Sequence, residues 1–417
     1  MATTKRRARN SQAAPEQSKP PGVGIPENAA TDPQPAAKKV PAKEPARARA
    51  KCTPKKAAPK KTMPDPARPE NPAGKSAFIR ALQFIKPGIS TGGGIVEQSD
   101  LVLMDGTRLV SFNDEVAVSH PFPIGHSGGI SANELFKLFQ KLPADDINIS
   151  QTVDEDNRNQ LTILCKNIEA NFFIAVDITV PELGLNDDVE WLGLPDDFCD
   201  AISFCKNSAA TDSAKGILTC INIIGDTVYG CDNLRATRKT LSEPLPDGIE
   251  MNIPVTAAKD LPAYAPTHFH KDDNWIHFKN ANGTIYSTRT MSMEYPNVAG
   301  LFEEREGETG SKLTLPIELK EALERTEIMA EEREGSKNRT VTVSINGGEI
   351  TCTGQSSVGR IVEKIKTGHK ESMQFIIIPS MLCQILETVH DASVFENRIV
   401  FNGEHFAHVV GIISPEN

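Results

Sequence analysis

Hydrophobic and polar positions follow one order repeatedly along most of the chain. A short strand leads into a stretch with the 3.6-residue period of an amphipathic helix, and short apolar runs joined by turn residues come next. The stretches that predict helices are residues 77–86, 132–142, 196–206, 256–263, 316–330 and 379–389. Six copies of this order, each of roughly 45–65 residues, indicate a chain built from a repeated unit.

Turn residues divide the apolar runs into predicted hairpins. Asp105-Gly106 is the clearest case, because Asp and Gly both tolerate the positive φ that a two-residue turn requires. Gly225-Asp226 and the three Asn-Gly pairs at 282–283, 346–347 and 402–403 take the same place in later copies. The predicted strands cover residues 101–104, 107–112, 115–121, 147–152, 161–165, 172–176, 217–224, 227–231, 275–279, 284–288, 341–345, 349–353, 374–378, 398–401 and 405–413.

Two copies of the unit make a segment of about 110 residues, which is an ordinary domain size. Three such pairs account for 75–184, 185–308 and 309–417, and the joins between them are polar. Each predicted domain therefore contains two β-α-β-β-β units. The expected fold class is α+β, with antiparallel sheets on one side and helices on the other.

The charges separate the first 74 residues from the rest. Residues 1–74 carry 16 Lys and Arg against 6 Asp and Glu, a net charge of +10, and hold 14 of the 29 prolines. Residues 75–417 carry 29 Lys and Arg against 49 Asp and Glu, a net charge of −20. A segment this rich in Pro, Ala and Lys lacks the apolar side chains that would offset its ordering entropy, which predicts a disordered tail.

The basic clusters of the tail, at 5–9 and 55–61, leave three interpretations open. They could neutralise DNA phosphates and add salt-sensitive affinity that does not depend on base sequence. The tail could also be a solvated linker without a partner, or an organelle transit peptide. A nuclear-import signal at 5–9 is a weak match of five residues.

Several classes of protein are excluded by what the sequence contains. No apolar run reaches the ~18–20 residues of a membrane helix, and the first residues lack the apolar core of a secretory signal. The eight cysteines form no C-x-x-C pair, and their apolar neighbours predict buried thiols in a reducing cytoplasm. No catalytic motif is present, and Gly92-Gly93-Gly94 lacks the lysine and helix start of a phosphate-binding loop.

One histidine-rich stretch is the only metal-like cluster. His268 and His270 alternate on a predicted strand and could share one face, with His277 and the pair Asp272-Asp273 nearby. Polar groups on a solvated strand beside a turn explain the same pattern more simply, so no metal ligand is assigned. A metal-dependent hydrolase that uses His268, His270 and Asp272 is the remote alternative that this cluster leaves open.

Three stretches resemble one family, the bacterial-type sliding clamp, which is the beta subunit of DNA polymerase III. Lys215-Gly216-Ile217-Leu218 with Val228 to Ala236 resembles the second-domain run that ends Thr-Asp-Gly-His-Arg-Leu. The run from Ser287 to Asn297 resembles the end of that domain in the family, Ser-Arg…Gly-x-Phe-Pro-Asp-Tyr. The run from His408 to Ile413 resembles the family's closing residues, Tyr-Val-Val-Met-Pro-Met. The six units in three domains match the family along residues 75–417, whereas the tail has no counterpart.

The resemblance implies three DNA-clamp domains and a pocket for a partner peptide between the second and third. Carried over residue by residue, the pocket lining is Ala214, Cys231, Asn233, Leu234, Arg235, Ala236, Pro296, Leu301, Val409, Val410, Ile412 and Ile413. Asn233 and Leu234 stand where the family has Gly and His, and Gly411-Ile412-Ile413 replaces Met-Pro-Met. These departures imply an apolar groove of altered shape in a divergent clamp, such as one encoded by a phage or mobile element. The alternative to a pocket role for Val409 to Ile413 is that these residues are ordinary core residues of an edge strand.

The resemblance also implies a non-catalytic DNA polymerase processivity factor. Two chains would join head to tail as a homodimer, enclose double-stranded DNA with their helices inward, and bind the replicative DNA polymerase and a clamp loader in the bacterial cytoplasm or nucleoid, without a cofactor. The helix cations expected to face DNA are Arg80, Lys86, Lys137, Lys141, Lys206, Lys259, Lys320 and Arg325. Scattered lysines suit weak phosphate contacts without base readout. The alternative is a DNA-associated adaptor that keeps the clamp fold, does not close a ring, and holds DNA through the tail.

Overall fold

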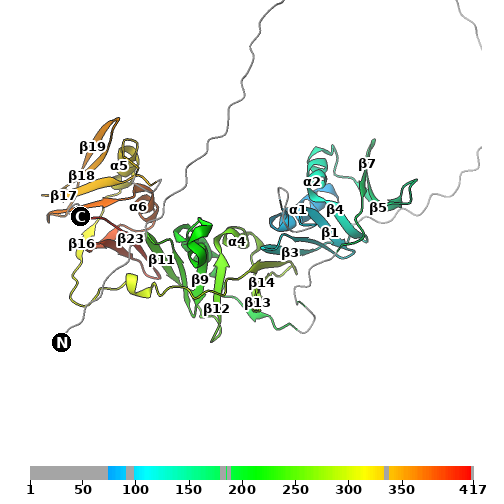
Figure 1. Ribbon diagram of the computed structural model, residues 1–417, viewed down its shortest axis with the longest axis horizontal. Coiled ribbons are helices and arrows are strands. Elements are labelled where there is room, and N and C mark those ends of the chain that lie inside the picture. The colour runs from blue at the N-terminus through cyan, green and yellow to red at the C-terminus, as the bar shows by residue number, and fades with distance from the viewer. Residues whose placement is uncertain (1–73, 91–97, 179–184, 186–188, 333–337, 415–417) are drawn as a thin grey trace, which may run out of the picture. The chain divides into compact units, whose positions relative to one another are not determined.

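The computed structural model describes residues 74–90, 98–178, 185, 189–332 and 338–414 (Figure 1). The predicted disordered tail lies outside these residues apart from Gly74, and so does Gly92-Gly93-Gly94. All structural statements here concern the described residues of Ala67–Asn417, which belong to one compact unit. None of its described helices combines the length and apolar character that crossing a membrane requires.

The described residues before 179 form two helix-and-strand units, as the sequence predicts. Ser131 precedes the second helix, and its hydroxyl donates to the carboxylate of Glu134 in the first turn. In chain order the elements are α1 (Lys75–Ile85), the 3₁₀ turn η1 (Lys86–Gly88), β1 (Leu101–Asp105), β2 (Arg108–Phe112), β3 (Val116–Pro121), β4 (Ser127–Ser131), α2 (Ala132–Lys141), β5 (Asn148–Val153), β6 (Asn159–Cys165) and β7 (Ile168–Phe173).

The second pair of units occupies residues 192–301. Its second helix is shorter than the 256–263 that the sequence predicts, because Pro262 lacks the N–H that would continue an α-helix. The elements are β8 (Leu192–Gly193), α3 (Phe198–Cys205), η2 (Lys206–Ser208), η3 (Ser213–Thr219), β9 (Cys220–Ile224), β10 (Thr227–Cys231), β11 (Arg235–Thr240), β12 (Glu250–Pro254), α4 (Val255–Asp260), η4 (Leu261–Tyr264), β13 (His268–Lys271), β14 (Trp275–Lys279), β15 (Ile285–Arg289) and η5 (Ala299–Leu301).

The third pair of units occupies residues 311–411. Pro379 opens the last helix at a position where its missing N–H costs nothing. The elements are β16 (Ser311–Thr314), α5 (Glu318–Glu327), β17 (Val341–Asn346), β18 (Glu349–Ser356), β19 (Gly359–Lys366), β20 (Met373–Ile377), α6 (Pro379–Ile385), β21 (Asp391–Val394), β22 (Arg398–Asn402) and β23 (Phe406–Gly411).

The described strands form four antiparallel sheets, and two of these run across the predicted domain boundaries (Figure 1). One eight-stranded sheet has the order β4-β1-β2-β3-β15-β14-β13-β8, and the other β12-β9-β10-β11-β23-β22-β21-β16. The pairing of β3 with β15 is called the first seam, and that of β11 with β23 the second seam. A four-stranded sheet, β19-β18-β17-β20, and a three-stranded sheet, β5-β6-β7, complete the set.

The helices pack in pairs that are adjacent in sequence: α1 with α2, α3 with α4, and α5 with α6. The first helix of each pair also covers strands of its own unit, such as β10 and β11 beneath α3. Gly230 shows how close this packing is, since a Cβ there would lie 2.3 Å from the carbonyl oxygen of Cys205. Gly354 meets Thr326 of α5 in the same way, at 1.8 Å.

These observations confirm the α+β fold class. The division at 184 and 308 stays a prediction, because the two seams join its parts into one compact unit. Three strands, β11, β19 and β21, lie where the sequence predicted none; β4, β8, β12 and β16 were given no range either, but each leads into a helix as the repeated order predicts. Strand β11 has a polar sequence and is held by hydrogen-bonded neighbours on both sides, and β19 alternates half-buried and exposed residues at the edge of its sheet.

The cysteines agree with the prediction of buried thiols. Six of the seven in the described residues are buried, and Cys199 is half-buried. Burial raises the pKa of Cys220 to about 11 and that of Cys352 to about 12, so neither is a thiolate at neutral pH. Cys52 lies outside the described residues.

Candidate partner-binding and nucleic-acid interfaces

The eight cations predicted to face DNA all lie on helices or directly after them. Lys206 and Lys320 are half-buried and the other six are exposed. Five form no ion pair within the described part of the chain: Arg80, Lys86, Lys141, Lys206 and Lys259. A cation without a carboxylate partner remains available to a phosphate.

The cations of α5 are neutralised by carboxylates. Lys320 Nζ lies 2.7 Å from Glu387, and Arg325 contacts Glu363 at 2.6 Å and Glu321 at 3.1 Å. The hydrogen bonds that Arg325 donates to Glu363 and Glu321 raise the pKa of its guanidinium. Helix α5 carries four glutamates against these two cations, so its surface is net acidic. Any attraction for DNA should therefore be weaker here than at the helices of the first two domains.

The turn between β10 and β11 positions Leu234. The Asp232 side chain accepts the N–H groups of Leu234 at 3.0 Å and Arg235 at 2.9 Å, and Asn233 takes a positive φ of 74°. The Leu234 carbonyl in turn accepts the N–H of Gly411 at 2.7 Å. These bonds hold the Leu234 side chain, which is 37% exposed, at the tip of a rigid turn.

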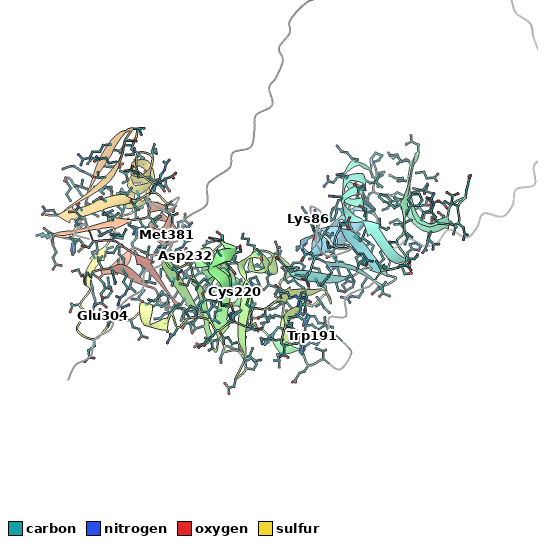
Figure 2. All side chains as sticks on the ribbon, viewed as in Figure 1. Lys86, Trp191, Cys220, Asp232, Glu304 and Met381 are labelled. Atoms are coloured by element: carbon teal, nitrogen blue, oxygen red, sulfur yellow. The ribbon has the colours of Figure 1, made fainter. Side chains whose placement is uncertain are left out.

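A cleft of about 410 Å³ opens beside this turn, where the second and third predicted domains meet. Asp232 and Met381 of α6, both labelled in Figure 2, line this cleft. Arg235 links the turn to α6, because its guanidinium donates to Gln384 of α6 at 2.5 Å and to Asp232 of the turn at 3.1 Å. Four of its lining residues were named from the sequence. Leu234 and Arg235 belong to the predicted peptide pocket, and Lys206 and Lys259 to the cations predicted to face DNA.

An apolar cluster behind this turn gathers four more residues of the predicted pocket. Cys231, Ala236 and Val409 are buried in it, and Leu301 packs against it. Tyr295 fills part of the same cluster, and its hydroxyl is buried there. This cluster spans the second seam and so joins residues far apart in the sequence.

The remaining residues of the predicted pocket lie elsewhere. Val410 and Ile412 belong to the core beneath α5 and α6, because successive strand residues point to opposite faces. Ile413 pairs with Ile376, which supports the edge-strand-core alternative for this run. Ala214, Asn233 and Pro296 are exposed. The structure therefore divides the twelve residues among a cleft, two cores and the surface, and their role in peptide binding stays a proposal.

The histidine-rich stretch does not converge on one point. His268 Nδ1 lies 2.9 Å from Thr267, and His270 Nδ1 lies 3.1 Å from the carbonyl of Glu190. No group of three or more His, Cys, Asp or Glu side chains in the described residues is arranged to hold a metal ion.

His277 instead joins a hydrogen-bonded row across β14 and β15. Its Nδ1 lies 2.8 Å from Ser287 Oγ, and its Nε2 lies 3.4 Å from Asp272. The order of groups is that of an Asp-His-Ser site, but His277 and Ser287 are both 0% exposed. A substrate could not reach the serine, so the row stabilises the sheet.

Sequence reasoning missed Lys215, Met381 and Gln384 in the cleft. Met381 and Gln384 lie on α6, more than 140 residues from Leu234 in the sequence. They reach the turn only because β11 pairs with β23, and the polar sequence of β11 gave no strand signal. Lys215 could have been found, because it directly precedes the Gly216 on which the resemblance rests.

Paired helices over antiparallel sheets that continue across the predicted domain boundaries are the features to compare with known proteins. No protein-family model matches the chain, and no curated protein matches its sequence. Solved structures do match: a DNA polymerase sliding clamp from Bacillus subtilis has 17% identity and a TM-score of 0.68. A DNA polymerase III beta chain from Streptococcus pneumoniae has 17% identity and a TM-score of 0.70, and the subunit from Pseudomonas aeruginosa has 14% and 0.68.

Each of these three matches covers 82% of this chain and 98% of the solved chain. Residues 75–417 make up about the same share of the sequence. At identities below a fifth the likeness establishes the fold: this chain has the fold of bacterial DNA polymerase sliding clamps.

Proposed function

We propose that the protein is a sliding clamp, a non-catalytic processivity factor that encircles duplex DNA and tethers a replicative DNA polymerase. The observation that carries this proposal is the fold match, which covers 98% of the length of a solved sliding clamp. Two chains would form the ring as a homodimer in the bacterial cytoplasm or nucleoid, a clamp loader would open it, and 75–184, 185–308 and 309–417 would be its domains. The cleft at Leu234 would receive a peptide of the polymerase.

Two open sheet edges support ring closure. Among the described strands, β7 pairs only with β6, and β19 pairs only with β18. An unpaired edge offers a row of N–H and C=O groups to another strand. Pairing β7 of one chain with β19 of its partner, at both ends, would leave neither edge unpaired and would close a two-chain ring.

Light scattering of the full chain across a dilution series tests closure. A dimer is expected at micromolar concentration, and Val362→Asp, which places a charge on the β19 edge, should shift it toward monomer. Ile224→Asp is the matched control, since Ile224 is also an exposed strand residue (52% against 44%) but lies on β9, away from both edges. A wild-type protein that is monomeric throughout would argue for the adaptor alternative.

Loading on DNA tests the second half of the proposal. The protein, assembled with a bacterial clamp loader on nicked circular DNA, should remain bound in high salt and slide off once the circle is cut. Deleting residues 1–74 should leave this retention intact, whereas an adaptor held by its basic tail would lose DNA on deletion. Equal retention on circular and linear DNA would contradict encirclement.

The charge difference between the helices gives a finer test. Lys137→Gln with Lys141→Gln should shorten the lifetime of loaded clamps on DNA several-fold at low salt. Lys320→Gln with Arg325→Gln should change it less than twofold, because glutamates already neutralise both cations. Equal effects of the two pairs would show that the ion pairs open when DNA is present.

A further inference from the structure

The cleft beside Leu234 carries positive charge that its own carboxylates do not balance. Lys206, Lys215 and Lys259 line it, and none of them forms an ion pair within the residues that the structure describes. The lysines of the cleft come from three separate elements of the fold: η2, η3 and the last turn of α4.

The two aspartates of the cleft are already engaged with their own turns. Asp212 accepts the N–H of Ala214 at 3.0 Å. Asp232 accepts two backbone N–H groups and pairs with the guanidinium of Arg235, and the side chains of both partners are only 14% exposed. A ligand that enters the cleft thus meets three lysines without partners and two carboxylates with partners.

The same cleft has apolar walls. Leu234, which is 37% exposed, supplies most of the apolar surface, and the largely buried Val255, Met381, Ala209 and Ala210 line the cleft with it. Apolar surface gains by contact with an apolar side chain, whereas a phosphate backbone gains nothing from it. At about 410 Å³ the cleft has the size of a pocket for a few side chains, which is too narrow for a duplex.

We infer that this cleft selects an acidic peptide segment of a partner protein. The segment would seat an apolar side chain against Leu234 and Met381 and place carboxylates beside Lys206, Lys215 and Lys259. This inference rests on the proposed function in assigning the cleft to a partner peptide, and it adds the charge of that peptide. The lysines would then give specificity and speed of encounter, and the apolar anchor would give residence time.

Fluorescence anisotropy with two synthetic peptides tests the inference. Both are labelled twelve-residue peptides with a central pair of leucines; one carries three flanking glutamates and the other carries glutamines at the same places. The glutamate peptide should bind the full-length protein at least tenfold more tightly at 50 mM salt. The gap should shrink at 0.5 M salt, where charges are screened. Equal binding of the two peptides would overturn the inference.

Substitutions in the cleft then locate the effect. Lys206→Gln, Lys215→Gln and Lys259→Gln together should remove the preference for glutamate. The matched control replaces Lys271, Lys312 and Lys370, three exposed lysines outside the cleft, by glutamine and should keep the preference. Leu234→Ala should weaken both peptides by a similar factor. An undiminished preference in the cleft triple variant would place the acidic site elsewhere and contradict the inference.

These experiments distinguish a failure of the acidic-peptide inference from a failure of the proposed clamp function. If clamps are retained on circular DNA but neither peptide binds, the inference fails and the processivity role stands. If retention is absent but the glutamate peptide binds at the cleft, the acidic-peptide site stands without the ring. If the triple variant shortens clamp lifetime on DNA while the two peptides bind alike, the lysines are DNA contacts and the inference is wrong.

Discussion

The two seams use the same pair of groups but bury it to different depths. At the first seam, His120 Nδ1 lies 2.8 Å from the Thr284 hydroxyl; at the second, His408 Nδ1 lies 2.7 Å from Thr237. Each imidazole also contacts a phenylalanine ring near the end of a helix, 4.7 Å away in α1 and 5.0 Å away in α3. His408 is only 7% exposed, whereas His120 is half-buried.

This difference determines how each seam is held. At the second seam the bond extends into a row in which Ser208, Thr237 and His408 are buried and must satisfy one another, while the exposed Thr388 ends the row at the surface. The first seam is supported by surface contacts such as the ion pair of Arg289 with Asp114. The seam beside the candidate cleft therefore contains a buried polar network, whereas the half-buried imidazole of the first seam can exchange its bond with water.

Lowering the pH should give the largest difference between the two seams in their contribution to the free energy of unfolding. Burial lowers the pKa of His408 to about 4, and the positive charge of Arg235 acts in the same direction; its other neighbours, Thr237, Thr388 and Phe204, are neutral. An unfolded histidine has a pKa of about 6.5, so below that pH the unfolded state binds more protons. Stability should fall between pH 6.5 and 4, by roughly 3 kcal/mol at its full extent.

Denaturant unfolding at pH 7.5, 5.5 and 4.5 measures this loss. His408→Gln keeps a polar side chain at the second seam but cannot be protonated, so it should flatten the decline relative to wild type. His120→Gln is the control at the first seam and should retain most of the decline, because a half-buried imidazole is more easily solvated when charged. An unchanged slope in His408→Gln would disprove the contrast.

Replacing each seam threonine by valine should give the next largest effect. Thr237→Val removes the hydroxyl between Ser208 and His408 and leaves two buried polar groups without partners, at a cost of about 2 kcal/mol. Thr284→Val should cost less than about 1 kcal/mol, since water can replace the bond to the half-buried His120. Unfolding free energies at pH 7.5 give both values, and the reverse order would show that burial does not control seam strength.

The sequence predicted the elements wherever one apolar pattern decided them. The helix at 132–142 and the hairpin at Asp105-Gly106 need only local spacing and turn chemistry, and both are present. Strand β11 was missed because its Arg, Thr and Lys side chains carry no apolar alternation; its partners β10 and β23 define it as a strand. The end of α4 differs from the predicted helix end by a few residues, because Pro262 follows the helix.

The candidate site was only partly predictable for a related reason. Leu234 and Arg235 were named because they fall in the run that resembles the family's second-domain motif, and the structure places both in the cleft. Val410 was assigned to the same pocket, yet its side chain points into the core beneath α6, while Val409 points to the other face of the sheet. Which strand residue faces which side depends on register, and register is fixed by pairing across the seam.

Removing one surface charge at the first seam should have the smallest effect. Asp114 Oδ1 lies 2.5 Å from Arg289 Nη2, but both side chains are about half exposed, at 53% and 43%. Asp114→Asn removes the charge and suits the positive φ of 72° there, since asparagine tolerates this conformation well. The expected loss is below about 0.5 kcal/mol, because exposed pairs gain little against solvent and side-chain entropy.

The loss should also disappear in 1 M salt, where the Debye length is about 3 Å. Denaturant unfolding of wild type and Asp114→Asn at low and high salt measures both features, and Thr284→Val in the same conditions supplies a comparison that salt should not alter. A loss as large as that of Thr237→Val would mean that the first seam depends on this ion pair. The distinction between a buried polar network and a solvent-exchanging seam would then have to be abandoned.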